Sequence, residues 1–168
     1  WLDPSTLRVM FDLNNDAQEA GRFLRPLGGP WCFFRRLRVL CAGQLVEDIM
    51  DYNRIHEMMH VMIAKECSEN DAAEAFGHVW GTHDFDTAKT NTDSFKGIYA
   101  GKKLTVLFKP LSGILNQNKM LPIRYAPITL ELELVDSALE PIVSTFPPNP
   151  GEFDFQEGNT SLEWSITN

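Results

Sequence analysis

Residues 33–49 read FFRRLRVLCAGQLVEDI, and this stretch decides the fold. Along 33–41 the side chains alternate between two faces, which is the period of a β-strand. Ala42-Gly43 then forms a two-residue turn, and residues 44–49 provide a returning strand. The stretch therefore predicts an antiparallel β-hairpin.

The first strand of this hairpin carries a concentration of positive charge. Arginines occupy both of its faces, at Arg35, Arg36 and Arg38. A strand that is charged on both faces fits poorly in the middle of a sheet, where at least one face is normally buried. We therefore expect this strand at a sheet edge or against another subunit.

Alternation of the same period recurs along the chain. The clearest case is residues 128–135, in which isoleucine and leucines face one way while threonine and glutamates face the other. Three weaker runs occur at residues 7–13, 104–108 and 162–166. A parallel α/β sheet would need a helix after nearly every strand, and helical spacing is confined here to one region. We predict an all-β, antiparallel β-sandwich with a helical insertion at about residues 52–76.

The helical insertion contains one apolar stripe at the three- and four-residue spacing of a helix. The stripe consists of Ile55, Met58, Met59, Met62 and Ile63, and Glu66 continues its spacing. We expect it, methionines included, to form part of the core. Ser68 and Asp71 have the spacing of a capping box, which predicts a second short helix from Glu69 to Gly77.

Composition and charge exclude several classes of protein. The 168 residues are 43% hydrophobic and 23% charged, as in an ordinary globular domain. The net charge of −8 repels phosphate, so we expect no direct sequence-specific contact with nucleic acid. The three cysteines lack metal-site spacing and predict free thiols. No apolar run approaches the roughly 18 residues of a transmembrane helix, so we expect no transmembrane segment.

One motif points to metal chemistry. His56-Glu57-Met58-Met59-His60 matches HExxH, in which two histidines one helical turn apart bind zinc and the glutamate acts as general base. A catalytic zinc also needs a third protein ligand, and no residue stands at a spacing that supplies one. We therefore favour an accidental match and expect no cofactor, catalytic residue or metal site. A zinc metallopeptidase that uses His56, His60 and Glu57 is the alternative.

Two longer blocks carry a family resemblance. The first lies within residues 33–58 and includes Arg36-Leu37-Arg38-Val39, Val46-Glu47-Asp48-Ile49, Tyr52-Asn53-Arg54 and His56-Glu57-Met58. The second lies within residues 108–133 and includes Phe108-Lys109-Pro110-Leu111-Ser112-Gly113, Leu121-Pro122-Ile123-Arg124-Tyr125 and Leu130-Glu131-Leu132-Glu133. In this order they resemble the first half of the double jelly-roll major capsid proteins of double-stranded DNA viruses. The polinton-like viruses, the virophages and their giant-virus relatives are the nearest group.

The resemblance implies a domain organisation and a function. Residues 1–136 would form an incomplete first jelly roll, residues 137–160 a proline-rich linker, and residues 161–168 the start of a second jelly roll. The chain begins without a methionine and its last strand is unfinished, so we expect a piece of a longer protein. The implied function is structural: homotrimeric, pseudo-hexameric capsomers that contact neighbouring capsomers and minor capsid proteins. The protein would be made in the host cytoplasm and located in the virion.

Two surfaces are candidates for the trimer interface. One is the arginine strand with Arg35, Arg36 and Arg38. The other is the proline-rich bend at residues 116–125, whose apolar and aromatic side chains suit an interface anchor. Its candidate residues are Asn116, Leu121, Arg124 and Tyr125. A cellular β-sandwich that binds glycans or protein partners would share this architecture and is a further alternative.

Overall fold

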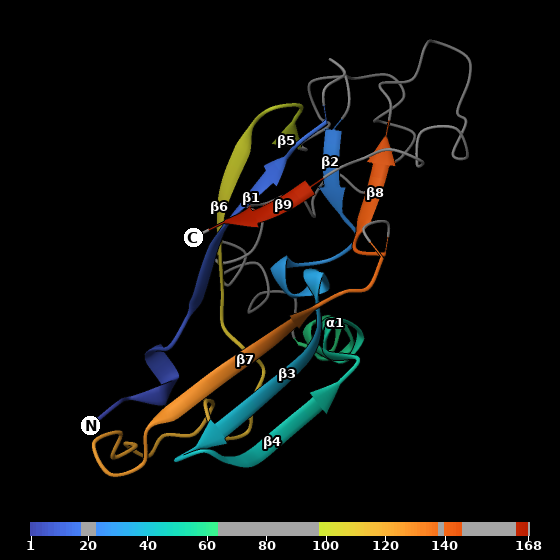
Figure 1. Cartoon of the computed structure of the whole chain (residues 1–168). Helices are drawn as coiled ribbons and strands as arrows, with labels where there is room; N and C mark the ends of the chain where they lie inside the picture. Colours follow the sequence, from blue (N-terminus) through green and yellow to red (C-terminus); the bar gives the residue numbers. More distant parts are fainter. Residues whose placement is uncertain (18–22, 64–97, 138–139, 146–163, 168) are drawn as a thin grey trace.

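A computed structural model describes residues 1–17, 23–63, 98–137, 140–145 and 164–167 (Figure 1). Within these residues there are nine strands: β1 (Val9–Asn15), β2 (Phe23–Pro26), β3 (Phe34–Cys41), β4 (Gln44–Met50), β5 (Ile98–Tyr99), β6 (Lys103–Phe108), β7 (Ile128–Leu134), β8 (Ile142–Thr145) and β9 (Trp164–Thr167). The helices of the same described ranges are α1 (Tyr52–Val61) and two 3-10 turns, η1 (Pro4–Thr6) and η2 (Pro30–Phe33). The predicted second helix from Glu69 to Gly77 lies outside the described residues.

The described strands form three antiparallel sheets, each with three strands that the structure describes. Their orders are β6-β1-β9, β5-β2-β8 and β4-β3-β7. Figure 1 shows the first two sheets in the upper part of the molecule and the third below them, with α1 beside β3 and β4. The prediction of an all-β antiparallel sandwich with a helical element is therefore confirmed. The described helices are too short and too polar to span a membrane.

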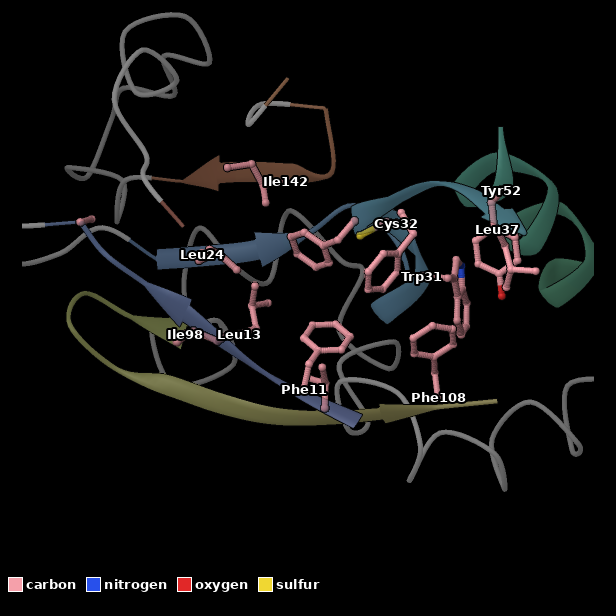
Figure 2. Packing of buried hydrophobic residues seen from close by; sticks show 14 of the residues in the cluster. Phe11, Leu13, Leu24, Trp31, Cys32, Leu37, Tyr52, Ile98, Phe108 and Ile142 are labelled. Atoms are coloured by element: carbon pink, nitrogen blue, oxygen red, sulfur yellow. The ribbon is translucent and has the colours of Figure 1, made fainter. Parts of the chain in front are cut away.

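The core lies between the sheets (Figure 2). Leu13 of β1, Leu24 of β2, Ile98 of β5 and Ile142 of β8 are all buried and belong to one cluster. Phe11 connects this upper part to the rest of the core through edge-to-face contacts. Its ring centroid lies 6.5 Å from Phe33, 5.5 Å from Phe34 and 6.4 Å from Phe108. Such aromatic pairs add to the stabilisation that comes from burial, so Phe11 fastens β1 to both β3 and β6.

The predicted hairpin is confirmed as β3 and β4. Ala42 and Gly43 both have positive φ, at 50° and 79°, which is the requirement of a type I′ turn. The register of β3 shifts at two points, and the first, between Val39 and Leu40, lies in its pairing with β4. In the pairing of β3 with β7, Phe34 lies opposite Leu134 and Arg36 opposite Glu133, so Arg35 is an extra residue in a β-bulge. The bulge explains why two consecutive arginines are both partly exposed.

The expectation that the arginine strand is an edge strand is wrong. β3 is the central strand of its sheet, with β4 on one side and β7 on the other. Neighbouring carboxylates make this position possible. Asp48 lies on β4, and Glu131 and Glu133 lie on β7. Opposite charges directly across a sheet stabilise it, and they let a cationic strand occupy the centre.

The C-terminal part of the chain contains more structure than expected. Residues 137–160 were predicted as a proline-rich linker, but Ile142–Thr145 within them form β8, which pairs with β2. Four residues without clear alternation give too weak a signal, and pairing with β2 decides their conformation. Residues 161–168 were predicted as the start of a second jelly roll. Their described part, β9, pairs antiparallel with β1, from Asp12 opposite Thr167 to Asn15 opposite Trp164.

Candidate functional site

The HExxH residues lie on α1, and the face that α1 buries is not the methionine stripe. The buried residues of the helix are Tyr52, Asn53 and His56. Met58 and Met62 are 57% and 70% exposed, so the prediction that the methionines are core is wrong. The helix follows β4 directly, and its N-cap residue Asp51 adopts a left-handed conformation with φ 49°. The direction of the helix is therefore set by this sharp junction and by the groups it packs against.

Trp31 of η2 is the group on which α1 packs. Trp31 is 4% exposed, and its ring stacks on that of His56, with centroids 3.9 Å apart and planes 15° from parallel. The ring of His60, one helical turn later, lies 4.9 Å from that of Trp31 at 54°. Figure 2 shows Trp31 between Tyr52 and Phe108. Both histidines of the motif therefore pack against one indole ring.

The glutamate of the motif binds the same tryptophan. Nε1 of Trp31 donates a 2.8 Å hydrogen bond to Oε2 of Glu57, and the backbone N–H of Gly29 donates to the same oxygen at 3.4 Å. Two glycines make room for this contact. A Cβ at Gly28 would lie 2.5 Å from Oε2 of Glu57, and a Cβ at Gly29 would lie 2.3 Å from the Trp31 ring. The Gly28-Gly29 pair therefore permits the close approach of α1 to η2.

His56 has one satisfied and one unsatisfied ring nitrogen. Its Nε2 lies 3.2 Å from the carbonyl oxygen of Lys109. A carbonyl only accepts, so Nε2 carries the proton and Nδ1 of the neutral ring does not. Nδ1 is buried and has no hydrogen-bond partner within the described part of the chain. Burial is the main cause that lowers the pKa of His56 to about 4, because a buried imidazolium loses its hydration.

This arrangement does not fit a catalytic zinc centre. A zinc ligand must offer an unprotonated nitrogen towards the metal, whereas Nε2 of His56 faces a carbonyl oxygen and the Glu57 carboxylate is bonded to an indole. Among the described residues, no three His, Cys, Asp or Glu side chains are grouped as metal ligands would be. We therefore derive no catalytic step from the motif. Its three residues attach α1 to η2.

The segment after β6 is attached to the same helix and to β4. The hydroxyl of Tyr52 accepts a 2.8 Å hydrogen bond from the N–H of Leu111, and burial raises the pKa of this phenol. Glu47 of β4 accepts hydrogen bonds from the Ser112 hydroxyl and, at 2.8 Å, from the Gly113 N–H. These side-chain bonds fix a segment that pairs with no strand in the described part of the chain.

The three arginines of β3 are each paired with a carboxylate. Arg36 binds Asp48 through two hydrogen bonds of 2.7 and 2.6 Å. Arg38 lies 3.1 Å from Glu131, and Arg35 pairs with Asp136. Exposed pairs of this kind contribute little to stability, because water and salt screen the attraction between the charges. Their effect here is to neutralise the outer face of the β4-β3-β7 sheet, which leaves little net charge for a partner to recognise.

The second set of interface candidates divides into two groups. Asn116 and Leu121 hold the bend in place: the Asn116 amide donates to the Pro110 carbonyl at 3.3 Å, and Leu121 exchanges two 2.8 Å backbone hydrogen bonds with Leu2. Arg124 and Tyr125 point outward instead, and Tyr125 is 80% exposed. The structure thus brings these candidates together on one bend, far in the sequence from the arginine strand.

Comparison with known proteins adds no identification. No family model, curated protein or solved structure matches this chain.

The residue that organises the site, Trp31, was not selected from the sequence. The available signal was the Gly28-Gly29-Pro30 run in front of it, because paired glycines beside a large aromatic residue are typical of close backbone approach.

Proposed function

We propose that this chain is a structural protein that assembles with copies of itself, as part of the first jelly roll of a double jelly-roll major capsid protein. The observation that carries the proposal is the spatial relation of the two blocks that bear the sequence resemblance. Residues 33–58 and 108–133 are separated by about fifty residues in the sequence, yet they form one unit.

The unit is joined by backbone pairing and by side chains. β3 of the first block lies between β4 of the same block and β7, most of which belongs to the second block. Hydrogen bonds connect the blocks a second time, away from β7. Ser112 and Gly113 of the second block donate to Glu47 of β4, and Leu111 donates to Tyr52 of α1. Chance resemblance in two separate segments gives no reason for them to be direct neighbours, so this contact supports a shared origin of both blocks.

The interior role of the HExxH residues supports the same proposal. His56 and Glu57 are used for packing and hydrogen bonding inside the domain, and a shell protein needs rigid walls and contact surfaces without catalytic groups. The expected partners are other copies in a homotrimeric capsomer, neighbouring capsomers and minor capsid proteins. The expected location is the virion, after synthesis in the host cytoplasm.

Self-association of the complete double jelly-roll protein that contains this chain tests this proposal. Light scattering coupled to size exclusion is expected to give a defined trimer, and electron microscopy is expected to show capsomers or shells at high protein concentration. A protein that stays monomeric at every concentration, salt and pH value would count against a capsid role. Such a result would favour the alternative of a β-sandwich that binds another kind of partner.

A further inference from the structure

β4 is an exposed edge strand that carries large apolar side chains. Within the described part of the chain it pairs only with β3, and no other described segment bonds to its backbone. Figure 1 shows β4 on the outer side of the β4-β3-β7 sheet. Leu45, Val46 and Met50 are 54%, 47% and 51% exposed. The outward N–H and C=O groups of such a strand are a template for pairing with a further strand.

The shape of this edge selects the strand that can pair with it. Natural edge strands usually carry lysine, proline or a β-bulge, which prevent pairing with other chains, and β4 contains neither lysine nor proline. It does contain a bulge, because Val46 has no opposite residue on β3 whereas its neighbours Leu45 and Glu47 do. A bulge increases the local twist of a strand. A regular strand therefore matches this edge poorly, whereas a strand with the same bulge at the same place matches it.

The charge of the β4-β3-β7 sheet lets two copies approach each other. β3 carries three arginines, and β4 and β7 carry two carboxylates each, so the sheet has a net charge of −1, against −8 for the chain. Both carboxylates of β4 already have partners. Asp48 is bonded to Arg36, and Glu47 accepts from Ser112 and Gly113. Two such edges therefore repel each other far less than the total charge of the chain implies.

We propose that β4 pairs antiparallel with β4 of a second copy of this chain, across a twofold axis at Val46. This axis brings the two bulges together and places Val46 of one copy opposite Val46 of the other. Glu47 then lies opposite Leu45 of the second copy, and Asp48 lies opposite Gln44, so no two carboxylates are directly opposed. An axis at Glu47 or at Asp48 would instead place like charges opposite each other, which destabilises a sheet.

The symmetry of the contact gives it a place in the assembly. This inference rests on the proposed function, because it names a surface through which the copies associate. A twofold contact joins the same surface of two copies and cannot build a threefold trimer. The β4 contact therefore joins copies that belong to neighbouring capsomers, and a different surface forms the trimer.

Disulfide cross-linking of the complete protein that contains this chain tests the contact directly. Val46→Cys is expected to give cross-linked pairs on oxidation, because directly opposed residues of antiparallel strands have Cα atoms about 4.5–5.5 Å apart, within disulfide reach. The matched control is Gln44→Cys, at another exposed position of β4. Its two thiols would be displaced by four residues, about 13 Å along the strands, and should not cross-link. The wild type gives the background from its own cysteines.

A charge exchange at the axis provides an independent readout. Val46→Lys and Val46→Glu each place two like charges opposite each other, so each is expected to raise the dissociation constant of the twofold contact at least tenfold, about 1.4 kcal/mol. Mixing these two variants should restore association, because unlike charges then meet at the axis. Thr129→Lys and Thr129→Glu, at an exposed position of β7, are the controls and should associate like the wild type. Equal urea midpoints would establish that all four variants fold, and Val46→Cys tests the contact without adding a charge.

The outcomes separate this inference from the proposed function. If trimers form but Val46→Cys does not cross-link, or the mixture of the two charged variants does not recover association, the inference is overturned and the capsid proposal stands. If the β4 strands pair but no trimer forms, the inference stands and the capsid proposal is overturned. If neither trimers nor cross-linked pairs form, both are overturned.

Discussion

Acidification should weaken the attachment of α1 through a single group, His56. The folded state lowers the pKa of this imidazole from the ordinary 6.5 to about 4, chiefly by burial. The unfolded chain therefore takes up the proton first as the pH falls. The stabilising contribution is fully present above pH 6.5 and is lost progressively between 6.5 and 4. Linkage gives a loss of about 2 kcal/mol at pH 5 and about 3 kcal/mol near pH 4.

Stacking on Trp31 opposes this loss to a limited extent. An imidazolium over an indole face gains a cation–π attraction of about 1 kcal/mol, which is less than the cost of desolvating the charge next to an Nδ1 with no partner. The net loss near pH 4 is therefore expected at about 2–3 kcal/mol. This is a large fraction of the stability of a domain, which is typically about 5–15 kcal/mol.

Urea unfolding followed by tryptophan fluorescence across this pH range measures the effect. His56→Gln should flatten the pH dependence between 6.5 and 4, whereas His60→Gln, one turn along the same helix, should retain most of it. An NMR titration of the His56 ring gives its pKa directly, even if the variant folds poorly. A His56 pKa near 6.5, or equal pH slopes for wild type and His56→Gln, would refute the reasoning.

Four further predictions concern individual contacts. Gly29→Ala should destabilise the fold by about 1–3 kcal/mol in urea unfolding, because the added Cβ would meet the rigid Trp31 ring. Gly28→Ala should destabilise it less, because the added Cβ would meet the movable end of the Glu57 side chain. Equal losses of stability for the two variants would contradict this account. Tyr52→Phe leaves the N–H of Leu111 without its acceptor and should cost about 1–3 kcal/mol, against no change for the exposed control Tyr125→Phe. Ala42→Asn should increase the free energy of unfolding by up to about 1 kcal/mol and raise the melting temperature, because asparagine tolerates positive φ better than alanine. A lower melting temperature would argue against strain at this turn. Hydrogen bonds from Lys103 to Asp12 and from Arg36 to Asp48 lower the pKa values of these two carboxyl groups below 3.8. The two carboxylates therefore stabilise the fold above pH 3.8, and this stabilisation is lost as the pH falls below that value. Asp48→Asn should reduce the loss of stability below pH 3.8 and leave the loss between pH 6.5 and 4 unchanged.

The strands of the fold were predictable because their signal is local. The alternation of residues 33–41 and 128–134 and the turn at Ala42-Gly43 are properties of adjacent residues, and the structure contains these elements. The bulge at Arg35 could not be predicted in this way. It depends on how β3 aligns with a strand about a hundred residues later, and an alternating pattern contains no information on that alignment.

The site was less predictable because its determinants are distant in sequence. Hydrophobic spacing favoured burial of Met59 and Met62, whereas the helix buries Tyr52 and His56. A polar side chain can be buried when a specific partner satisfies its hydrogen-bonding groups. The N–H of Leu111 is the partner of the Tyr52 hydroxyl. The carbonyl of Lys109 and the ring of Trp31 are the partners of His56. A sequence pattern ranks residues by polarity and cannot identify such partners. It also cannot show that the Glu57 carboxylate is already bonded to an indole.

The pairing of β9 with β1 also bears on the order in which the molecule folds. Residues that meet there, such as Asp12 and Thr167, are about 150 positions apart, whereas β3 and β4 are joined by a two-residue turn. Hairpins form within about 1–10 μs, but closing a long loop is entropically unfavourable until other contacts shorten it. We expect the β3–β4 hairpin to form early and β9 to join last. Until that final step, the edge of β1 that later binds β9 is unpaired. An incompletely folded chain is therefore most prone to pair wrongly with other chains along β1.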